Sequence, residues 1–250
     1  MIQLFNIQHH KIDTSEFNNL LHDDVVVKLE KKIAKYVGSK YACSVNSATN
    51  AIFLIMDYFL KPRTIKIPSM IPPVVANAIL TSHNKIEFTD NIKWIGDSYI
   101  LHKFGTYKVV DSAQKLEKNQ FRKECKSNDV MIFSNYPTKP LGGIDGGIIV
   151  TDDYKKYKWM KEAVLNGMTF AENNWERSIS FPGYKMYMNS IQAFITMQNL
   201  KALDNKNKRL WDIQEYYNSE LNLDNNSYHL YRINVSNRKD FMGSMKKNGF

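Results

Sequence analysis

Three short polar segments, each directly after a run of apolar residues, contain the side chains best suited to chemistry. Asp111 ends the apolar segment of residues 108–111 and supplies a carboxylate. Lys139 supplies an amine and is presented rigidly, because it lies between Pro137 and Pro140. Residues 46–49, with the sequence NSAT, start a helical pattern, where free backbone N–H groups, the helix dipole and two hydroxyl groups favour an anion.

Each segment taken alone also has an ordinary structural explanation. Ser47 is a common type of helix cap, and a lone aspartate at the end of a strand is usually a cap or a loop residue. Four glycines between residues 142 and 147 let a ligand or another backbone come close, but they lack the GKS or GKT spacing of a phosphate loop. No single segment identifies a function.

The surrounding sequence alternates helical and strand patterns, which predicts an α/β fold with a mostly parallel sheet. Strands are expected at residues 41–45, 65–68, 86–88, 98–101, 108–111, 130–134, 147–151 and 227–235. Helices are expected at residues 24–37, 51–60, 72–80, 154–165 and 189–207, with a last one after residue 236 that Gly249 ends. Ligands of such sheets lie at the carboxyl ends of strands, where all three polar segments fall.

Composition and charge describe an ordinary globular protein with a basic surface. The chain has 250 residues, of which 43% are hydrophobic and 24% charged, and a formal net charge of +9. Lysines make up 28 of the 34 basic residues and are spread along the chain, which indicates a solvated surface that attracts small anions rather than a nucleic-acid groove. No apolar run approaches the roughly 20 residues of a membrane span and no signal peptide is evident, so we expect a cytoplasmic protein without a membrane partner.

Residues that could bind a metal or form a disulfide are few. Cys43 and Cys125 are too far apart to suggest either, and Cys43 is expected to pack inside a buried strand. His9 and His10 form an isolated pair near a terminus, without a carboxylate or cysteine partner, and are expected at the surface. We expect no metal site.

Considered together, the polar segments resemble a known family. The resemblance rests on VVDSAQ at residues 109–114, FSNYPTKPLGGIDGGIIVTDD at 133–153, LEKKIAKYVGSKYACSVNSATNAIFLI at 29–55 and GYKMYMNSIQAFITMQNLKALDNKNKR at 183–209. In order and approximate spacing these segments are similar to those of the DegT-type nucleotide-sugar aminotransferases, pyridoxal-phosphate enzymes of fold type I. The resemblance implies a cofactor-binding α/β domain, with helices flanking a central sheet, over residues 1–205 and a reduced C-terminal α+β domain over residues 206–250.

The same resemblance implies a role for each polar segment. Lys139 matches the lysine that forms a Schiff base with pyridoxal 5'-phosphate and then moves protons between the substrate carbon and the cofactor C4′. Asp111 matches the carboxylate that keeps the pyridinium nitrogen protonated, and Gln114 matches a glutamine near the cofactor ring. The family's phosphate contacts fall at Ser47, Ala48, Thr49 and Ser134.

The sequence departs from the family at several positions. An aromatic residue that stacks on the cofactor ring is replaced by Pro72, with Met70 as a possible substitute. Near Gly183, where the family has an Asn and an Arg, this chain has Lys185 and Tyr187. Because that Asn reaches the cofactor phosphate of the partner subunit, the resemblance implies a homodimer in which Lys185 neutralises the phosphate as a point charge.

The chain is also a compact version of the family pattern. Between Asp90 and Asp111 it lacks strand and helix sequence, including a crossover helix before the carboxylate strand. Relatives continue beyond the helix that matches residues 240–247. The cofactor residues are therefore retained better than the segments that complete a sugar-nucleotide site.

Two functions of different kinds remain open. The first is a pyridoxal-phosphate-dependent transaminase that moves an amino group, with glutamate as donor, onto a keto group of a nucleotide-linked deoxysugar in surface-polysaccharide or glycan synthesis. Lys139 disfavours the related dehydratases, which have a histidine at that position. The second is a shortened, non-catalytic paralogue that acts as a binding or assembly partner.

Overall fold

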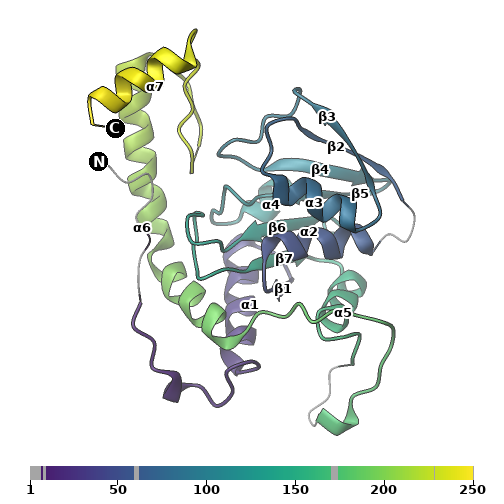
Figure 1. The fold of residues 1–250 in the computed structure, drawn as a ribbon. Helices are drawn as coiled ribbons and strands as arrows, with labels where there is room; N and C mark the ends of the chain where they lie inside the picture. The colour runs from purple at the N-terminus through teal and green to yellow at the C-terminus, as the bar shows by residue number, and fades with distance from the viewer. Residues whose placement is uncertain (1–6, 8–9, 59–61, 170–173, 228, 250) are drawn as a thin grey trace.

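A central sheet of five strands organises the protein, and helices cover both of its faces (Figure 1). The structure is a computed structural model that describes residues 7, 10–58, 62–169, 174–227 and 229–249. In spatial order the strands are β1 (Tyr41–Val45), β7 (Gly147–Thr151), β6 (Val130–Ser134), β5 (Tyr107–Asp111) and β4 (Tyr99–Phe104). A separate parallel pair consists of β2 (Thr64–Pro68) and β3 (Lys85–Thr89).

The directions of the strands correct the expectation of a mostly parallel sheet. Among the described residues of the five-stranded sheet, β5 and β6 run parallel, whereas the pairs β1–β7, β6–β7 and β4–β5 are antiparallel. Two residues, Gly105 and Thr106, separate β4 from β5. So short a connection joins antiparallel strands, because a parallel pair needs a crossover of a dozen or more residues. The predicted α/β class, with helices flanking a central sheet, is confirmed.

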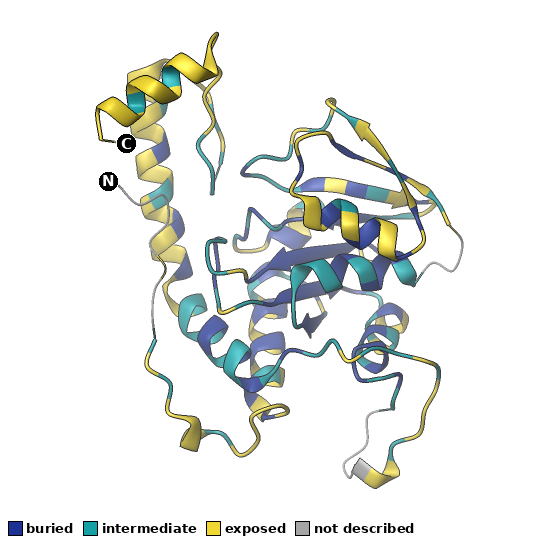
Figure 2. Cartoon of the chain, viewed as in Figure 1, coloured by how far each residue is buried: buried dark blue, intermediate teal, exposed yellow. Residues whose placement is uncertain are grey.

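Two apolar clusters lie on opposite faces of the sheet. Alternate residues of β6 divide between them: Val130 and Ile132 pack with α2, α3 and α5, whereas Met131 and Phe133 pack with α1, α4 and α6. The helices are α1 (Asp24–Val37), α2 (Ala48–Asp57), α3 (Pro73–Thr81), α4 (Gln120–Glu124), α5 (Tyr154–Ala163), α6 (Ser190–Leu221) and α7 (Arg238–Lys247), with 3-10 turns at Thr14–Glu16 and Asn174–Glu176. Strands β6 and β7 are buried along their whole length, so the centre of the sheet is rigidly held (Figure 2).

Local signals explain where the long helices begin and end. Asp23 accepts a hydrogen bond from the N–H of Val25 at the start of α1, and Gly38 ends that helix in the left-handed conformation, with φ of +81°. Asn189 and Gln192 form a capping box at the start of α6. This helix continues past the expected end at residue 207 because no glycine or proline interrupts it before Asn222. None of the described helices is both long and apolar enough to cross a membrane.

The C-terminal segment corrects a second expectation. A strand is expected at residues 227–235, but the described residues of this segment are irregular and contain no strand; Tyr228 lies outside the described residues. A strand needs a neighbouring strand to pair its backbone groups, and after Thr151 the described residues contain no other strand. The last predicted helix is present as α7.

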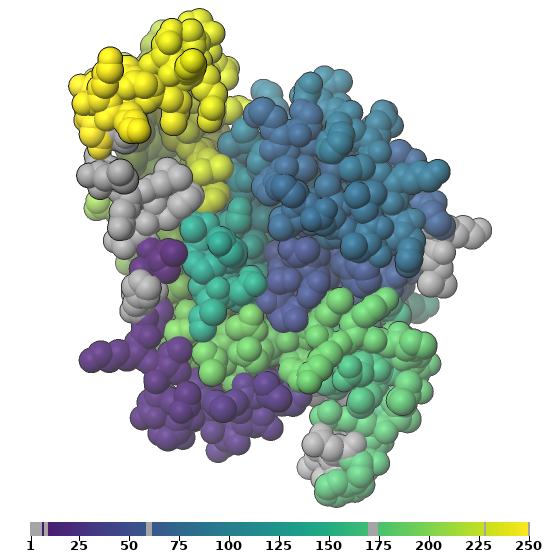
Figure 3. All heavy atoms as spheres, viewed as in Figure 1, coloured from purple at the N-terminus to yellow at the C-terminus, as the bar shows by residue number. Residues whose placement is uncertain are grey.

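The proposed division between residues 205 and 206 falls inside α6, which therefore links the two parts of the chain. The C-terminal residues around α7 form a lobe beside the α/β body (Figure 3). We keep the division into a large domain and a short C-terminal domain as a proposal, with α6 as the connecting element.

Candidate active site

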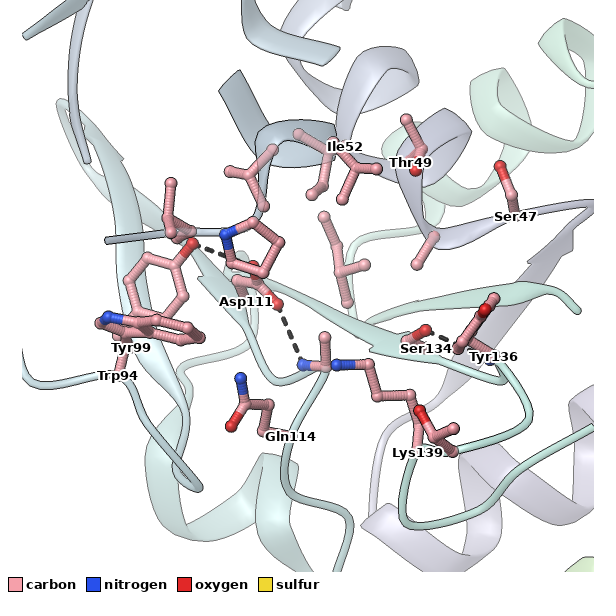
Figure 4. Close-up of a pocket in the computed structure, with 18 of the residues that line it drawn as sticks. Ser47, Thr49, Ile52, Trp94, Tyr99, Asp111, Gln114, Ser134, Tyr136 and Lys139 are labelled. Atoms are coloured by element: carbon pink, nitrogen blue, oxygen red, sulfur yellow. Dashed lines mark hydrogen bonds between the residues drawn. The ribbon is translucent and has the colours of Figure 1, made fainter. Parts of the chain in front are cut away.

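A cavity of about 480 Å³ opens where β5 and β6 end and α2 begins (Figure 4). Its volume is in the range of small-ligand sites. Seven of the eight predicted site residues line it, namely Ser47, Ala48, Thr49, Asp111, Gln114, Ser134 and Lys139. Three segments far apart in the sequence therefore meet at one place, as the strand-end pattern predicts.

The N-terminus of α2 forms one end of the cavity. Ser47 caps the helix by accepting a hydrogen bond from the N–H of Asn50 at 3.1 Å. The first N–H groups of a helix have no partner within it, so those of Ala48 and Thr49 are available to an anion. A Cβ added at Gly147 would lie 2.7 Å from Ala48 Cα, so glycine is required for β7 to pass this close to the helix start.

Ser134 faces the same end of the cavity from β6. Its Oγ accepts a hydrogen bond from the N–H of Tyr136 at 3.3 Å, and its hydroxyl hydrogen remains available to a ligand. In Figure 4, Ser47, Thr49 and Ser134 surround one end of the cavity, while Tyr99, Trp94 and Asp111 lie toward the other.

Asp111 provides a buried carboxylate at the opposite end. Oδ2 accepts a hydrogen bond from Tyr99 Oη at 2.9 Å, and Oδ1 accepts one from the N–H of Ala113 at 2.9 Å. Burial raises the pKa of Asp111, while these two hydrogen bonds and the positive charge of Lys139 oppose the rise. The carboxylate is therefore held in one orientation at a place where a cationic group of a ligand would be stabilised.

Lys139 projects into the cavity from the loop that follows β6. The Lys139 N–H donates to Tyr136 O at 2.9 Å, which closes a four-residue turn with Pro137 at its second position. Lys206 Nζ on α6 donates to Pro140 O at 2.7 Å and ties the loop down. Burial lowers the pKa of Lys139, so more of its amine is neutral and nucleophilic than for an exposed lysine.

Gln114 lines the cavity but also holds a neighbouring loop. Its Oε1 accepts a hydrogen bond from the N–H of Gly96 at 2.7 Å. This contact fixes the segment that carries Trp94 and Asp97 into the cavity wall. The amide nitrogen of Gln114 and the second lone pair of its oxygen remain for a contact with a ligand.

Three aromatic residues that line the cavity, Trp94, Tyr99 and Tyr136, are not among the site residues predicted from the sequence. Pro72, at the start of α3, lines the cavity as expected for the position that replaces the ring-stacking aromatic. Met70 does not line the cavity and is 75% exposed, so it is no substitute for that aromatic. Trp94 instead brings an aromatic surface to this wall.

The C-terminal segment also approaches the site. A Cβ added at Gly96 would lie 1.6 Å from Ser227 Oγ, so the segment rests against the loop that carries Trp94. Burial and the positive charges of Lys139 and Lys206 lower the pKa of His229 to about 4. His229 is therefore neutral at pH 7. No pattern in the sequence predicts that it lies near Lys139.

Lys185 is the predicted residue that the structure keeps out of this cavity. It pairs with Leu165 in an isolated bridge and lies near His22, whose pKa is lowered by burial and by the charges of Arg177, Lys161 and Lys185. Within one chain, Lys185 thus belongs to a different, cationic region of the surface.

The cavity combines a polar end for an anion, a buried carboxylate at the far end and an amine between them. A flat molecule with a phosphate at one end and a basic ring nitrogen at the other matches this arrangement. The amine of Lys139 can bond covalently to a carbonyl carbon and can afterwards transfer protons.

The chain is similar in sequence to sugar aminotransferases. The sequence model of the DegT/DnrJ/EryC1/StrS aminotransferase family matches residues 7–90 and 77–249. The chain is 25% identical to the spore coat polysaccharide biosynthesis protein SpsC of Bacillus subtilis, over 91% of this chain and 72% of that protein. It is 23% identical to the UDP-4-amino-4,6-dideoxy-N-acetyl-beta-L-altrosamine transaminase of Campylobacter jejuni, over 87% of this chain and 69% of that protein.

The fold is similar to that of solved structures as well. AtS13 from Actinomadura melliaura superposes with a TM-score of 0.82 at 17% identity, and the match covers 100% of this chain and 83% of that one.

Proposed function

Because the chain belongs to the DegT/DnrJ/EryC1/StrS aminotransferase family, we propose that it is a transaminase that acts on a keto group of a nucleotide-linked deoxysugar. Enzymes of this family use pyridoxal 5'-phosphate. The observation that carries the proposal is the convergence of Lys139, Asp111 and the start of α2 on one cavity.

The residues of the cavity fit the cofactor on structural grounds. Ala48 and Thr49 at the start of α2 line the cavity, so their N–H groups would be available to an anion such as the phosphate. Gly147 lets β7 pack against this helix start, because a Cβ there would lie 2.7 Å from Ala48 Cα. Ser47, Thr49 and Ser134 would add hydroxyl contacts to that phosphate. Asp111 lies at the far end, where it would pair with the pyridine nitrogen.

When bound, pyridoxal 5'-phosphate supplies an aldehyde carbon and a ring that accepts electrons. Lys139 Nζ, with its lowered pKa, is suited to bond that carbon and then to accept a proton from the donor carbon and return it. Asp111 would keep the ring nitrogen protonated, since its negative charge favours a cation beside it. Ile52, Ile71 and Val75 line the cavity with apolar surface and limit the entry of water.

The names of the relatives support the substrate class. One relative is named for spore coat polysaccharide biosynthesis and another for the transamination of a UDP-linked deoxysugar. We therefore propose a role in polysaccharide or glycan sugar synthesis, with glutamate as amino donor and the cytoplasm as location.

The test is the absorbance spectrum of the purified protein with added pyridoxal 5'-phosphate, recorded before and after addition of glutamate. We expect a visible band from the cofactor bound to Lys139, its loss with glutamate, and one 2-oxoglutarate formed per site. Absence of the band would contradict the cofactor assignment. A band that no amino donor changes would favour the non-catalytic binding or assembly partner.

We further propose a homodimer in which Lys185 reaches the cofactor phosphate of the partner subunit. A second cavity, of about 550 Å³, lies on the side of the chain where Arg177 and His22 are found, and Leu21 and Val27 add exposed apolar surface to its lining. Exposed apolar surface is a feature of protein contact sites, and the cations of this region would attract a phosphate that a second subunit brings near.

Lys185→Ala should weaken cofactor binding by about tenfold, because a charged contact to the phosphate is lost. Equilibrium titration with pyridoxal 5'-phosphate measures the change, and Lys208→Ala, an exposed lysine on α6, is the matched control. A mixed dimer of one Lys139→Ala subunit and one Lys185→Ala subunit should keep about half of the native activity, since one of its two sites is complete. The active site of this mixed dimer should bind the cofactor with native affinity, and a tenfold weaker affinity at that site would contradict sharing.

A further inference from the structure

The β4–β5 hairpin brings an unexpected side chain to the carboxylate at the end of the cavity. The two strands are joined by Gly105 and Thr106, and Gly105 has a φ of +57°, as glycine has at the first position of a type II′ turn. Because the strands are antiparallel, the start of β4 lies beside the end of β5. Tyr99, the first residue of β4, is thereby placed at Asp111, the last residue of β5.

A β-bulge sets which residue of β4 reaches Asp111. Near the turn, His102 pairs with Val109, but beyond the irregularity Ile100 pairs with Val110 and Tyr99 with Asp111. Continuation of the first register would place Ile100, rather than Tyr99, opposite Asp111. The extra residue, Leu101, therefore re-aims the strand so that a hydroxyl-bearing side chain faces the carboxylate.

The contact between the two side chains is short and buried. Tyr99 Oη donates to Asp111 Oδ2 at 2.9 Å, and Tyr99 and Asp111 are 7% and 4% exposed. Both residues line the cavity (Figure 4). The groups that act on Asp111 are Tyr99 from β4, the N–H of Ala113 from the following turn and Lys139 from the loop after β6.

We propose that Tyr99 is a positioning residue that holds Asp111 ionised and correctly oriented for the cofactor nitrogen, a role that rests on the proposed function. Its hydroxyl occupies one side of the carboxylate, and the Ala113 N–H occupies the other. Each oxygen keeps further capacity to accept a hydrogen bond, and Asp111 lines the cavity, so the carboxylate can still accept one from a ligand there. Tyr99 itself stays protonated, because burial and the charge of Asp111 raise its pKa well above the usual value.

Tyr99→Phe tests this role with little change in shape. In the protein without cofactor we expect the pKa of Asp111 to rise by about one to two units, because a hydrogen bond to the charged form is lost. A ¹³C carboxyl NMR titration measures it, with the resonance assigned by its absence in Asp111→Asn. In the loaded enzyme, the acid limb of the kcat profile should move to higher pH by a similar amount, and kcat at the optimum should fall about tenfold.

Tyr107→Phe is the matched control, since it makes the same chemical change at the other end of the same hairpin. It should leave the titration of Asp111 unchanged. An unchanged Asp111 pKa in Tyr99→Phe, or an equal shift in Tyr107→Phe, would overturn the proposal. A shift specific to Tyr99→Phe in a protein that never binds pyridoxal 5'-phosphate would instead count against the proposed function, and the hold of Tyr99 on Asp111 would stand.

Discussion

Lys139→Ala should abolish the covalent attachment of pyridoxal 5'-phosphate and lower transamination by about 10³-fold or more, because both the bonding amine and the proton carrier are removed. The loop that presents residue 139 is held by the backbone turn at Pro137 and by Lys206, and neither contact uses the Lys139 side chain. The free energy of unfolding should therefore change by less than about 1 kcal/mol. Borohydride reduction followed by peptide mass spectrometry measures the attachment.

Lys206 provides a demanding control for that experiment. It is a second lysine beside the loop, and desolvation lowers its pKa as well. Lys206→Ala should retain the reduced adduct on the peptide that contains Lys139, although the loop loses a hydrogen bond to Pro140 O. An adduct that persists in Lys139→Ala and disappears in Lys206→Ala would reassign the bonding lysine.

Asp111→Asn should lower kcat by about 10²-fold or more while the protein still binds the cofactor. The amide cannot stabilise a cationic ring nitrogen, and removal of one preorganised charge partner has effects of this size. The substitution leaves Ser47, Thr49 and Ser134 in the cavity lining, and the phosphate contacts proposed for them should keep the cofactor in place. Single-turnover rates with glutamate, together with a binding titration, separate the two effects, and equal losses in rate and binding would contradict the assigned role.

Asp111→Asn lowers kcat, but it should not lower the free energy of unfolding of the cofactor-free protein at neutral pH. Burial raises the pKa of Asp111 above that of the unfolded chain, which is about 4, so the native state binds the proton more tightly. The stability that this residue contributes is complete below that pH and is lost as the pH rises through the native pKa. At pH 7, Asp111→Asn should therefore be at least as resistant to urea as the native protein, with the difference reduced below about pH 4.

The parts of the fold that sequence predicts well are those whose local pattern and environment agree. The strands at residues 130–134 and 147–151 have the predicted bounds, because continuous apolar runs are typical of strands buried on both faces. The pattern at residues 227–235 also alternates like a strand, but its described residues are irregular, and in the described part of the chain no strand follows β7 to pair with it. An alternating pattern indicates that a segment suits a half-buried strand, but it does not show that the fold provides a strand for it to pair with.

In the candidate site, too, some residues could be predicted from the sequence and others could not. Asp111, Lys139 and the polar residues at the start of α2 each follow an apolar strand. The carboxyl ends of strands that run in the same direction lie at one edge of a sheet, so these residues meet there. Tyr99 could not be found in this way, because a count of residues across the Gly105 turn places Ile100 opposite Asp111 until the bulge is known. Trp94 lies in an irregular loop that is held by tertiary contacts, among them the hydrogen bond from the Gly96 N–H to Gln114 and the ion pair between Lys115 and Asp97. No periodicity in the sequence reports either contact.

The pairing of β1 with β7 also determines which side of the cavity can form first during synthesis of the chain. Tyr41 pairs with Thr151, so β1 must wait for 110 more residues, which takes roughly 5 to 20 seconds of synthesis. The β4–β5 hairpin can close within microseconds of its emergence, because two residues separate its strands. The nascent chain can therefore complete the carboxylate side of the cavity early, whereas the helix start at Ser47 cannot settle against Gly147 until β7 has left the exit tunnel.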